Sequence, residues 1–203
     1  MRPVVVVHGF LSTRGSMLPL AVQLRRRGLR VYRATLPPLC IQDVRLLAQA
    51  VGRSVDDARR RSGADEVDVV GVSQGGLAAL YYVRRLRGTD HVRRLVTLGT
   101  PFEGTWFAAV GVPLLGAVSR GVWQSLPTSD VVRELAMAGP SPGEDVVSIA
   151  REGDTVAPPA RCRVEGAKHV VLPGTRLPGT HQTLGFHPVV VDATLEALHP
   201  AAR

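Results

Sequence analysis

Residues 66–77 read Glu66-Val67-Asp68-Val69-Val70-Gly71-Val72-Ser73-Gln74-Gly75-Gly76-Leu77. The β-branched run 67–72 predicts a buried strand, and a helix pattern follows Ser73 at once. The flanking glycines complete a G-x-S-x-G pattern, which leaves room for a strand that turns abruptly into a helix. Such a turn projects the serine beyond the carboxyl end of the sheet and sets the N–H of Gln74 at a helix N-terminus, where negative charge is stabilised. This geometry suits a nucleophile whose attack creates an oxyanion; the alternative is a glycine-rich turn with an incidental serine.

The rest of the chain alternates between strand and helix patterns. Hydrophobic periodicity predicts strands over 2–7, 29–34, 67–72, 92–98, 146–150 and 169–172, and helices over 17–27, 42–61, 77–87, 130–137 and 189–198. Several of these strands are continuously apolar, which is typical of a parallel sheet covered by helices on both faces. A chain of 203 residues is long enough for one domain with a full core, so we expect a single domain over 1–203.

Composition narrows the class of protein. Apolar residues make up 45% of the chain, and the longest apolar stretch, 108–118, is too short to span a bilayer. Cys40 and Cys162 are too few for a disulfide framework, and the start of the chain lacks a signal-peptide pattern, so we expect free thiols and a cytoplasmic location. No His/Cys/Asp cluster has the spacing of metal ligands, and no metal or organic cofactor is expected.

The net charge of +8 comes almost entirely from arginine, since only Lys168 among the 25 basic residues is a lysine. Arginine clusters can bind nucleic acid or an anionic surface. Most of these clusters fall near the ends of predicted helices, where cations favour the helix dipole, and no aromatic residue interrupts the arginine triplets. We therefore expect no nucleic-acid partner.

Loops that follow the predicted strands supply partners for Ser73, because the carboxyl ends of parallel strands meet at one edge of the sheet. Gly9 lets the chain pass close to the Ser73 turn, so Phe10 is the candidate for a second oxyanion donor; His8 could act as a base, although a structural hydrogen-bonding role is favoured at the end of its strand. Asp154 lies in a turn after the fifth strand, where it is either a rigidly held carboxylate or an ordinary turn residue.

A histidine follows the sixth strand at His181. Its imidazole is suited to take a proton from serine and return it to a leaving group near neutral pH. The resulting chain order of Ser73, Asp154 and His181 is the order that accompanies this type of serine turn.

Five segments together carry a family resemblance: 5–10, 71–76, 97–101 (Thr-Leu-Gly-Thr-Pro), 153–158 (Gly-Asp-Thr-Val-Ala-Pro), and His181 ahead of Leu184 and Pro188. On these motifs the chain resembles a small bacterial α/β-hydrolase of the lipase/esterase type. The resemblance implies a three-layer α/β fold with a mostly parallel sheet of about six strands that lacks the family's first two edge strands. It also implies an acyl-enzyme mechanism with Ser73 as nucleophile, His181 as base and Asp154 as the orienting acid.

Some alternatives stay open within this scheme. His169 and His187 are rival bases, although His169 lies in a strand pattern and His187 stands at a helix start beside Pro188. Asp130 is the rival acid; if it held that role, the acid would lie after the fourth strand, as in some relatives of the fold.

The substrate signal lies in 101–127, which contains both tryptophans and two of the four phenylalanines. This stretch is too apolar for a solvated loop, so we expect a lid that lines an acyl pocket or a buried helix, and the two are compatible. We expect a hydrophobic acyl group to contact Leu11, Phe102, Trp106, Phe107, Leu114 and Trp123. The expected function is a serine carboxylic-ester hydrolase that acts on a small hydrophobic ester; a thioesterase or acyltransferase with the same triad, and a non-catalytic arginine-rich binding module, are the alternatives.

Overall fold

The computed structural model describes residues 2–175 and 179–199. In these residues six parallel strands form one sheet in the order β2-β1-β3-β4-β5-β6. The strands are β1 (Val4–Val7), β2 (Val31–Arg33), β3 (Val67–Val72), β4 (Val92–Leu98), β5 (Val146–Arg151) and β6 (Lys168–Leu172). The number and direction of the strands confirm the prediction from sequence, and β2 forms the outer edge where the family's first two strands would otherwise pair.

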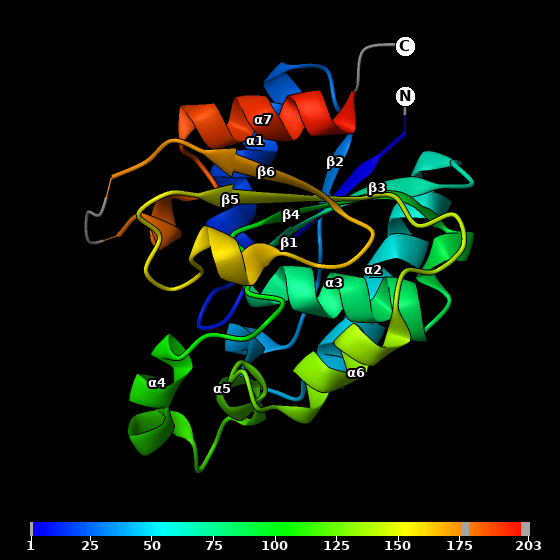
Figure 1. Ribbon diagram of the computed structural model, residues 1–203. Helices are drawn as coiled ribbons and strands as arrows, with labels where there is room; N and C mark the ends of the chain where they lie inside the picture. The colour runs from blue at the N-terminus through cyan, green and yellow to red at the C-terminus, as the bar shows by residue number, and fades with distance from the viewer. Residues whose placement is uncertain (1, 176–178, 200–203) are drawn as a thin grey trace.

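Helices cover both faces of this sheet (Figure 1). One face carries α1 (Leu18–Arg26) and α7 (Pro188–Leu198), and the other carries α2 (Val44–Ser62), α3 (Gln74–Arg85) and α6 (Asp130–Ala138). Two separate apolar clusters fill the spaces between the layers. The predicted three-layer arrangement is therefore confirmed.

Two helix starts differ from the prediction. Periodicity predicted a helix over 77–87, whereas α3 begins at Gln74, directly after the Ser73 turn, as the G-x-S-x-G pattern indicated. Gly75 packs against the backbone of Val7 and His8, and Gly76 packs against the side chain of Thr100. The first predicted helix, 17–27, instead opens with a 3-10 turn (Arg14–Met17), and α1 follows from Leu18.

The outer edge of β2 is covered by arginine side chains. Arg25 Nη2 donates to the carbonyl of Val31 at 2.5 Å, and Arg14 Nε donates to the carbonyl of Arg33 at 3.1 Å. An edge strand offers unpaired backbone groups to other chains. These two hydrogen bonds occupy acceptors that a further strand would otherwise use.

The segment 101–127 leaves the sheet after β4 and carries two short helices, α4 (Phe107–Leu115) and α5 (Arg120–Gln124). Both lie beyond the sheet, below α3 in Figure 1. In the described parts of the chain, no helix has the length and hydrophobicity of a transmembrane span.

Candidate active site

Ser73 stands at the apex of the turn between β3 and α3. Its backbone has φ 53° and ψ −127°, a conformation that non-glycine residues seldom adopt. A Cβ on Gly71 would lie 2.6 Å from Cα of Gly76, and a Cβ on Gly75 would lie 2.5 Å from the carbonyl oxygen of His8. Side chains at either position would force apart the backbones that meet behind Ser73.

A chain of hydrogen bonds joins the three predicted residues. His181 Nε2 lies 2.9 Å from Ser73 Oγ, and His181 Nδ1 lies 2.7 Å from Asp154 Oδ2. The three side chains come from loops after β3, β5 and β6, all at the carboxyl edge of the sheet. Because a carboxylate only accepts, Nδ1 carries the proton that it shares with Asp154, and Nε2 is left to accept the hydroxyl proton of Ser73.

The Asp154 carboxylate is fixed by backbone hydrogen bonds to the oxygen that does not face His181. Its side chain has no exposed surface, and its Oδ1 accepts the backbone N–H groups of Val156 and Ala157, each at 2.9 Å. These two bonds fix the carboxylate plane and leave Oδ2 for His181. The turn position therefore gives a rigidly oriented carboxylate, with the residues 155–157 supplying the scaffold.

The loop after β1 packs directly against the Ser73 turn. A Cβ on Gly9 would lie 2.8 Å from the carbonyl oxygen of Val72 and 3.4 Å from the backbone nitrogen of Gln74. Gln74 is the first residue of α3, so its N–H has no partner within the helix. The two predicted oxyanion donors, Phe10 and Gln74, thus belong to backbone segments that the fold brings into contact.

The rival bases and the rival acid lie elsewhere. His169 is within β6, and His187 precedes the first turn of α7; no described hydrogen bond links either ring to Ser73. Asp130 pairs with Arg45 at 2.8 Å, and this hydrogen bond lowers the pKa of Asp130.

His8 is buried beneath the loop rather than aimed at Ser73. Its Nδ1 lies 3.2 Å from the carbonyl oxygen of Gly9 and 3.4 Å from Cys40 Sγ, and burial lowers the pKa of the ring. Burial raises the pKa of the Cys40 thiol to about 12, so this sulfur is not a thiolate nucleophile near neutral pH. The favoured structural role of His8 agrees with these contacts.

Three residues that support the site were quoted from the sequence only as parts of the resemblance motifs, without a role in the site. Gly99, with φ 55°, passes so close to the triad that a Cβ there would lie 3.3 Å from Asp154 Oδ2 and 3.5 Å from His181 Cε1. Thr100 Oγ1 donates to the carbonyl of Ser73 at 2.9 Å, and Leu184 is buried against Gly99. The position of 99 and 100 directly after a predicted strand was the available signal.

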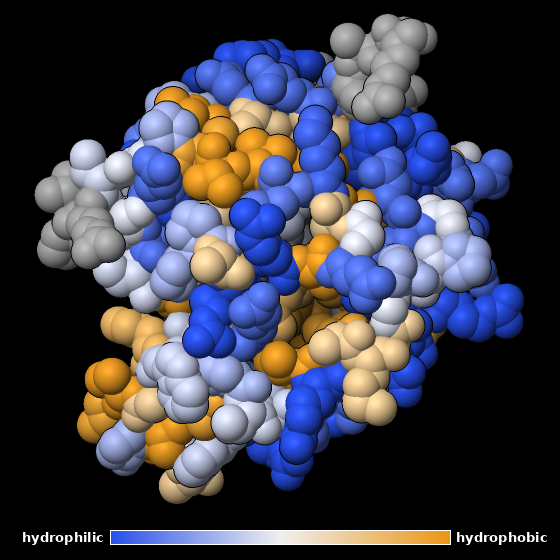
Figure 2. All heavy atoms as spheres, viewed as in Figure 1, coloured by the Kyte–Doolittle hydropathy of each residue, from blue (hydrophilic) through white to orange (hydrophobic). Residues whose placement is uncertain are grey.

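In the apolar segment 101–127, most side chains of α4 are exposed, so the expectation of a buried helix is wrong for α4, whereas most residues of α5 are buried. Phe102 is buried, whereas Trp106, Phe107, Leu114 and Trp123 are exposed, with Leu114 at 82%. Figure 2 shows the apolar side chains of α4 gathered at the lower left of the molecule. Leu11 is also exposed.

The second half of the segment is anchored to the Ser73 turn. Gln74 Nε2 donates to the carbonyl of Gly121 at 3.1 Å, and the side-chain oxygen of Gln124 accepts the N–H of Val44 at 2.7 Å. The N–H of Gly121 donates to the carbonyl of Ile41 at 3.1 Å. Thus α5 is fixed against α3 and the start of α2, while α4 projects from it.

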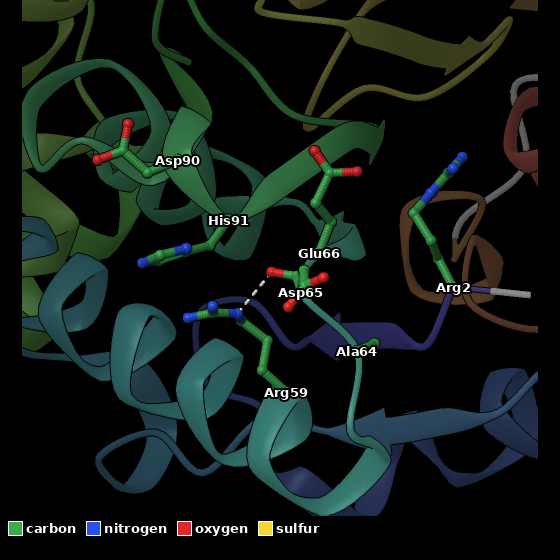
Figure 3. Close-up of a pocket in the computed structure, with 7 residues that line it drawn as sticks. All are labelled: Arg2, Arg59, Ala64, Asp65, Glu66, Asp90 and His91. Carbon is green, nitrogen blue, oxygen red and sulfur yellow. Dashed lines mark hydrogen bonds between the residues drawn. The ribbon is translucent and has the colours of Figure 1, made fainter.

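A separate cavity of about 660 Å³ lies at the opposite end of the sheet (Figure 3). It is formed by residues that precede β1, β3 and β4, among them Arg2, Glu66 and His91, and Arg59 donates to the carbonyl of Asp65 at its rim. Ligands of open α/β sheets bind outside the carboxyl ends of the strands. This cavity at the amino ends is therefore not part of the candidate site.

A family model described as the alpha/beta hydrolase fold matches residues 2–112, which is more than half of the chain. The chain therefore belongs to the alpha/beta hydrolase family. A sequence comparison with curated proteins finds no match.

Solved structures with the same fold include lipases. The propeptide form of Bacillus licheniformis lipase BlEst2 superposes with a TM-score of 0.85 at 16% identity, over 100% of this chain and 51% of that one. Its mature form gives 0.77 at 16% identity over 96% and 88% of the two chains. Aspergillus fumigatus lipase B gives 0.79 at 18% identity over 97% and 52%. The chain thus spans about half the length of the propeptide form and of the fungal lipase, and at these identities the likeness shows the fold.

Proposed function

We propose that this protein is a serine hydrolase of carboxylic esters that works through an acyl-Ser73 intermediate. The observation that supports it most is the continuous hydrogen-bonded chain Ser73–His181–Asp154, with distances of 2.9 and 2.7 Å. Neither bond needs rearrangement before reaction.

In this proposal Ser73 Oγ attacks the ester carbonyl while His181 Nε2 takes its proton. Asp154 stabilises the imidazolium that forms, and its burial makes that electrostatic interaction stronger than it would be in water. The backbone N–H groups of Gln74 and Phe10 stabilise the oxyanion. His181 then protonates the leaving alcohol, and a water molecule activated by the same ring releases the acid.

A hydrophobic acyl group suits the surroundings. The exposed apolar side chains of α4 belong to the same segment as α5, whose Gly121 accepts a hydrogen bond from the side chain of Gln74, the residue after Ser73. We propose that this segment contacts the acyl chain and that Leu11, Phe102, Trp106, Phe107, Leu114 and Trp123 contribute to that contact. The solved structures that share the fold include lipases, which supports the assignment of a hydrophobic acyl group.

The test compares p-nitrophenyl esters with acyl thioesters on the wild type and on Ser73→Ala. We expect ester turnover in the wild type, a loss on the order of 10³-fold or more in Ser73→Ala, and no change in Ser141→Ala, whose serine lies before β5. Faster turnover of thioesters than of matched esters would identify the protein as a thioesterase instead. Activity in Ser73→Ala above a tenth of the wild-type value would remove Ser73 from the role.

A further inference from the structure

A second polar groove lies away from the triad, along the outer edge of the sheet. It has a volume of about 270 Å³ and runs between the end of β2 and the outer side of α2. Four guanidinium groups and a single carboxylate line it: Arg14, Arg33, Arg53, Arg61 and Asp57. Such a surplus of positive charge within one groove is not explained by the fold alone.

Of the four arginines in this groove, only Arg61 has an acidic partner among the described residues, namely Asp57. Arg14 Nε donates to the carbonyl of Arg33, and Arg33 Nη1 donates to the carbonyl of Arg14, both at 3.1 Å. Among the residues that the structure describes, neither guanidinium has a carboxylate oxygen within 4.0 Å, and neither does Arg53. Asp57 is shared between Arg60 and Arg61, at 3.7 and 3.5 Å. Because these hydrogen bonds hold Arg14 and Arg33 beside each other, their positive charges repel, and a bound anion would reduce that repulsion.

The wider surroundings reinforce this charge. More than half of the described arginines that lack a carboxylate within 4.0 Å come from the stretch that builds this edge: Arg14, Arg25, Arg26, Arg30, Arg33 and Arg53. Elsewhere many arginines are neutralised within the fold, as in the buried pair of Arg84 and Glu144. The potential at the β2 edge is therefore positive and available to a ligand.

The donors favour a compact anion with several oxygens. Guanidinium groups bind phosphate oxygens through two parallel N–H bonds, and the hydroxyl-bearing residues Tyr32 and Thr35 line the same groove. The ring of Tyr32 is covered by Arg61, whose Cζ lies 5.3 Å from the ring centroid. Because that face is occupied, the groove offers no free aromatic platform on which a nucleic-acid base could stack.

We propose that this groove binds the phosphoryl group of a phosphate monoester. Arg14, Arg33 and Arg53 bind its oxygens, and the hydroxyl of Thr35 completes the donor set. The end of β2 lies two strands from the end of β3, about 10 Å across the sheet, so this ligand does not compete for Ser73. The assignment is independent of the hydrolase function.

The experiment measures the binding of inorganic phosphate and of glycerol 3-phosphate by calorimetry and by thermal shift, against chloride at matched ionic strength. The variants are Arg53→Gln and Arg14→Gln. Arg85→Gln, an exposed arginine at the end of α3, removes the same charge outside the groove. The side chain of Arg53 is exposed and has no hydrogen-bond partner in the described residues, so its substitution should leave the fold intact.

We expect saturable phosphate binding that raises the melting temperature of the wild type and of Arg85→Gln. In Arg53→Gln the affinity should fall about tenfold, as expected for one lost charge-assisted hydrogen bond. Binding that is absent in the wild type, or that weakens equally in Arg53→Gln and Arg85→Gln, would overturn the proposal.

Two arms separate the sources of the phosphoryl group. Vesicles of phosphatidylcholine with and without phosphatidic acid present the monoester on a membrane, and glycerol 3-phosphate presents it in solution. Cosedimentation that depends on phosphatidic acid and is lost in Arg53→Gln supports a lipid headgroup. Binding of glycerol 3-phosphate without such cosedimentation supports a small soluble phosphate ester.

Discussion

Asp154 determines which nitrogen of His181 carries the proton. An asparagine at this position would keep an oxygen toward the N–H groups of Val156 and Ala157 and turn its amino group toward Nδ1. Nδ1 would then have to accept, and the ring proton would move to Nε2, where it blocks proton transfer from Ser73. We therefore expect Asp154→Asn to lower kcat by roughly 10³-fold or more with little change in KM.

The matched control is Asp130→Asn. Asp130 is paired with Arg45, and its side chain is 47% exposed, so its change should leave kcat within a factor of about two, as for a surface substitution. Should Asp130→Asn be the variant that loses turnover, the acid assigned here would be wrong.

Individual residues differ in how far the sequence determines them. Ser73 follows from its own neighbours, because the strand run and the flanking glycines define the turn. The choice of His181 over His169 and His187 depends on the path of the loop after β6, which no local pattern encodes. Gly99 was quoted only as part of the 97–101 motif, and its role was not predicted for the same reason: its proximity to Asp154 and His181 arises only when three strand ends are brought together.

Among the helices, α4 has an apolar sequence but lies where its side chains are exposed to solvent. Its side chains are apolar yet exposed, in contrast to α2, where the apolar stripe is buried. Periodicity could predict a helix in each case, but it could not tell an apolar helix that is buried from one that is exposed. Exposed apolar side chains in a group indicate a surface that meets another apolar body.

This contrast gives a prediction for Trp106→Ala and Leu114→Ala. Since both side chains are exposed, at 59% and 82%, truncation should change the free energy of unfolding by no more than about 0.5 kcal/mol. If they contact the acyl chain, kcat/KM should fall more for long esters than for acetate, because each methylene buried contributes about 0.8 kcal/mol. An acyl-length series with melting temperatures checks both points.

Leu46→Ala provides the control, since Leu46 is 52% exposed on α2. It should leave the acyl-length profile unchanged. Equal losses for acetate and for long esters in Trp106→Ala and Leu114→Ala would show that α4 does not bind the acyl chain.

For the molecule as a whole, alternating strands and helices were sufficient to predict a three-layer parallel sheet. Hydrophobic periodicity could not predict the order of the strands in the sheet. That order follows from right-handed crossovers and from the family resemblance. The single-domain assignment over 1–203 and the cytoplasmic location stay predictions.

One long-range contact ties the layers together at the end of the sheet away from Ser73. Arg84 of α3 donates through Nε and Nη2 to the carboxylate of Glu144, and both side chains are at most 2% exposed. Removing one partner of a buried ion pair leaves an uncompensated charge, so Glu144→Gln should lower the free energy of unfolding by about 3–5 kcal/mol. Urea unfolding measures this directly.

The control for this pair is Asp90→Asn. Asp90 Oδ2 lies 3.1 Å from Arg87 Nη2, and the side chain of Arg87 is 86% exposed. That surface pair should contribute at most about 1 kcal/mol. Equal midpoints for Glu144→Gln and Asp90→Asn would refute the role given to the buried pair.

The central claim is that Ser73 is a nucleophile activated by His181 and Asp154. Covalent labelling by a fluorophosphonate, mapped by mass spectrometry of the digested protein, tests it most directly. We expect one phosphonylated peptide that contains Ser73, with a labelling rate at least about 10²-fold lower in His181→Ala and no label in Ser73→Ala. Labelling at another serine, or an unchanged rate in His181→Ala, would contradict it.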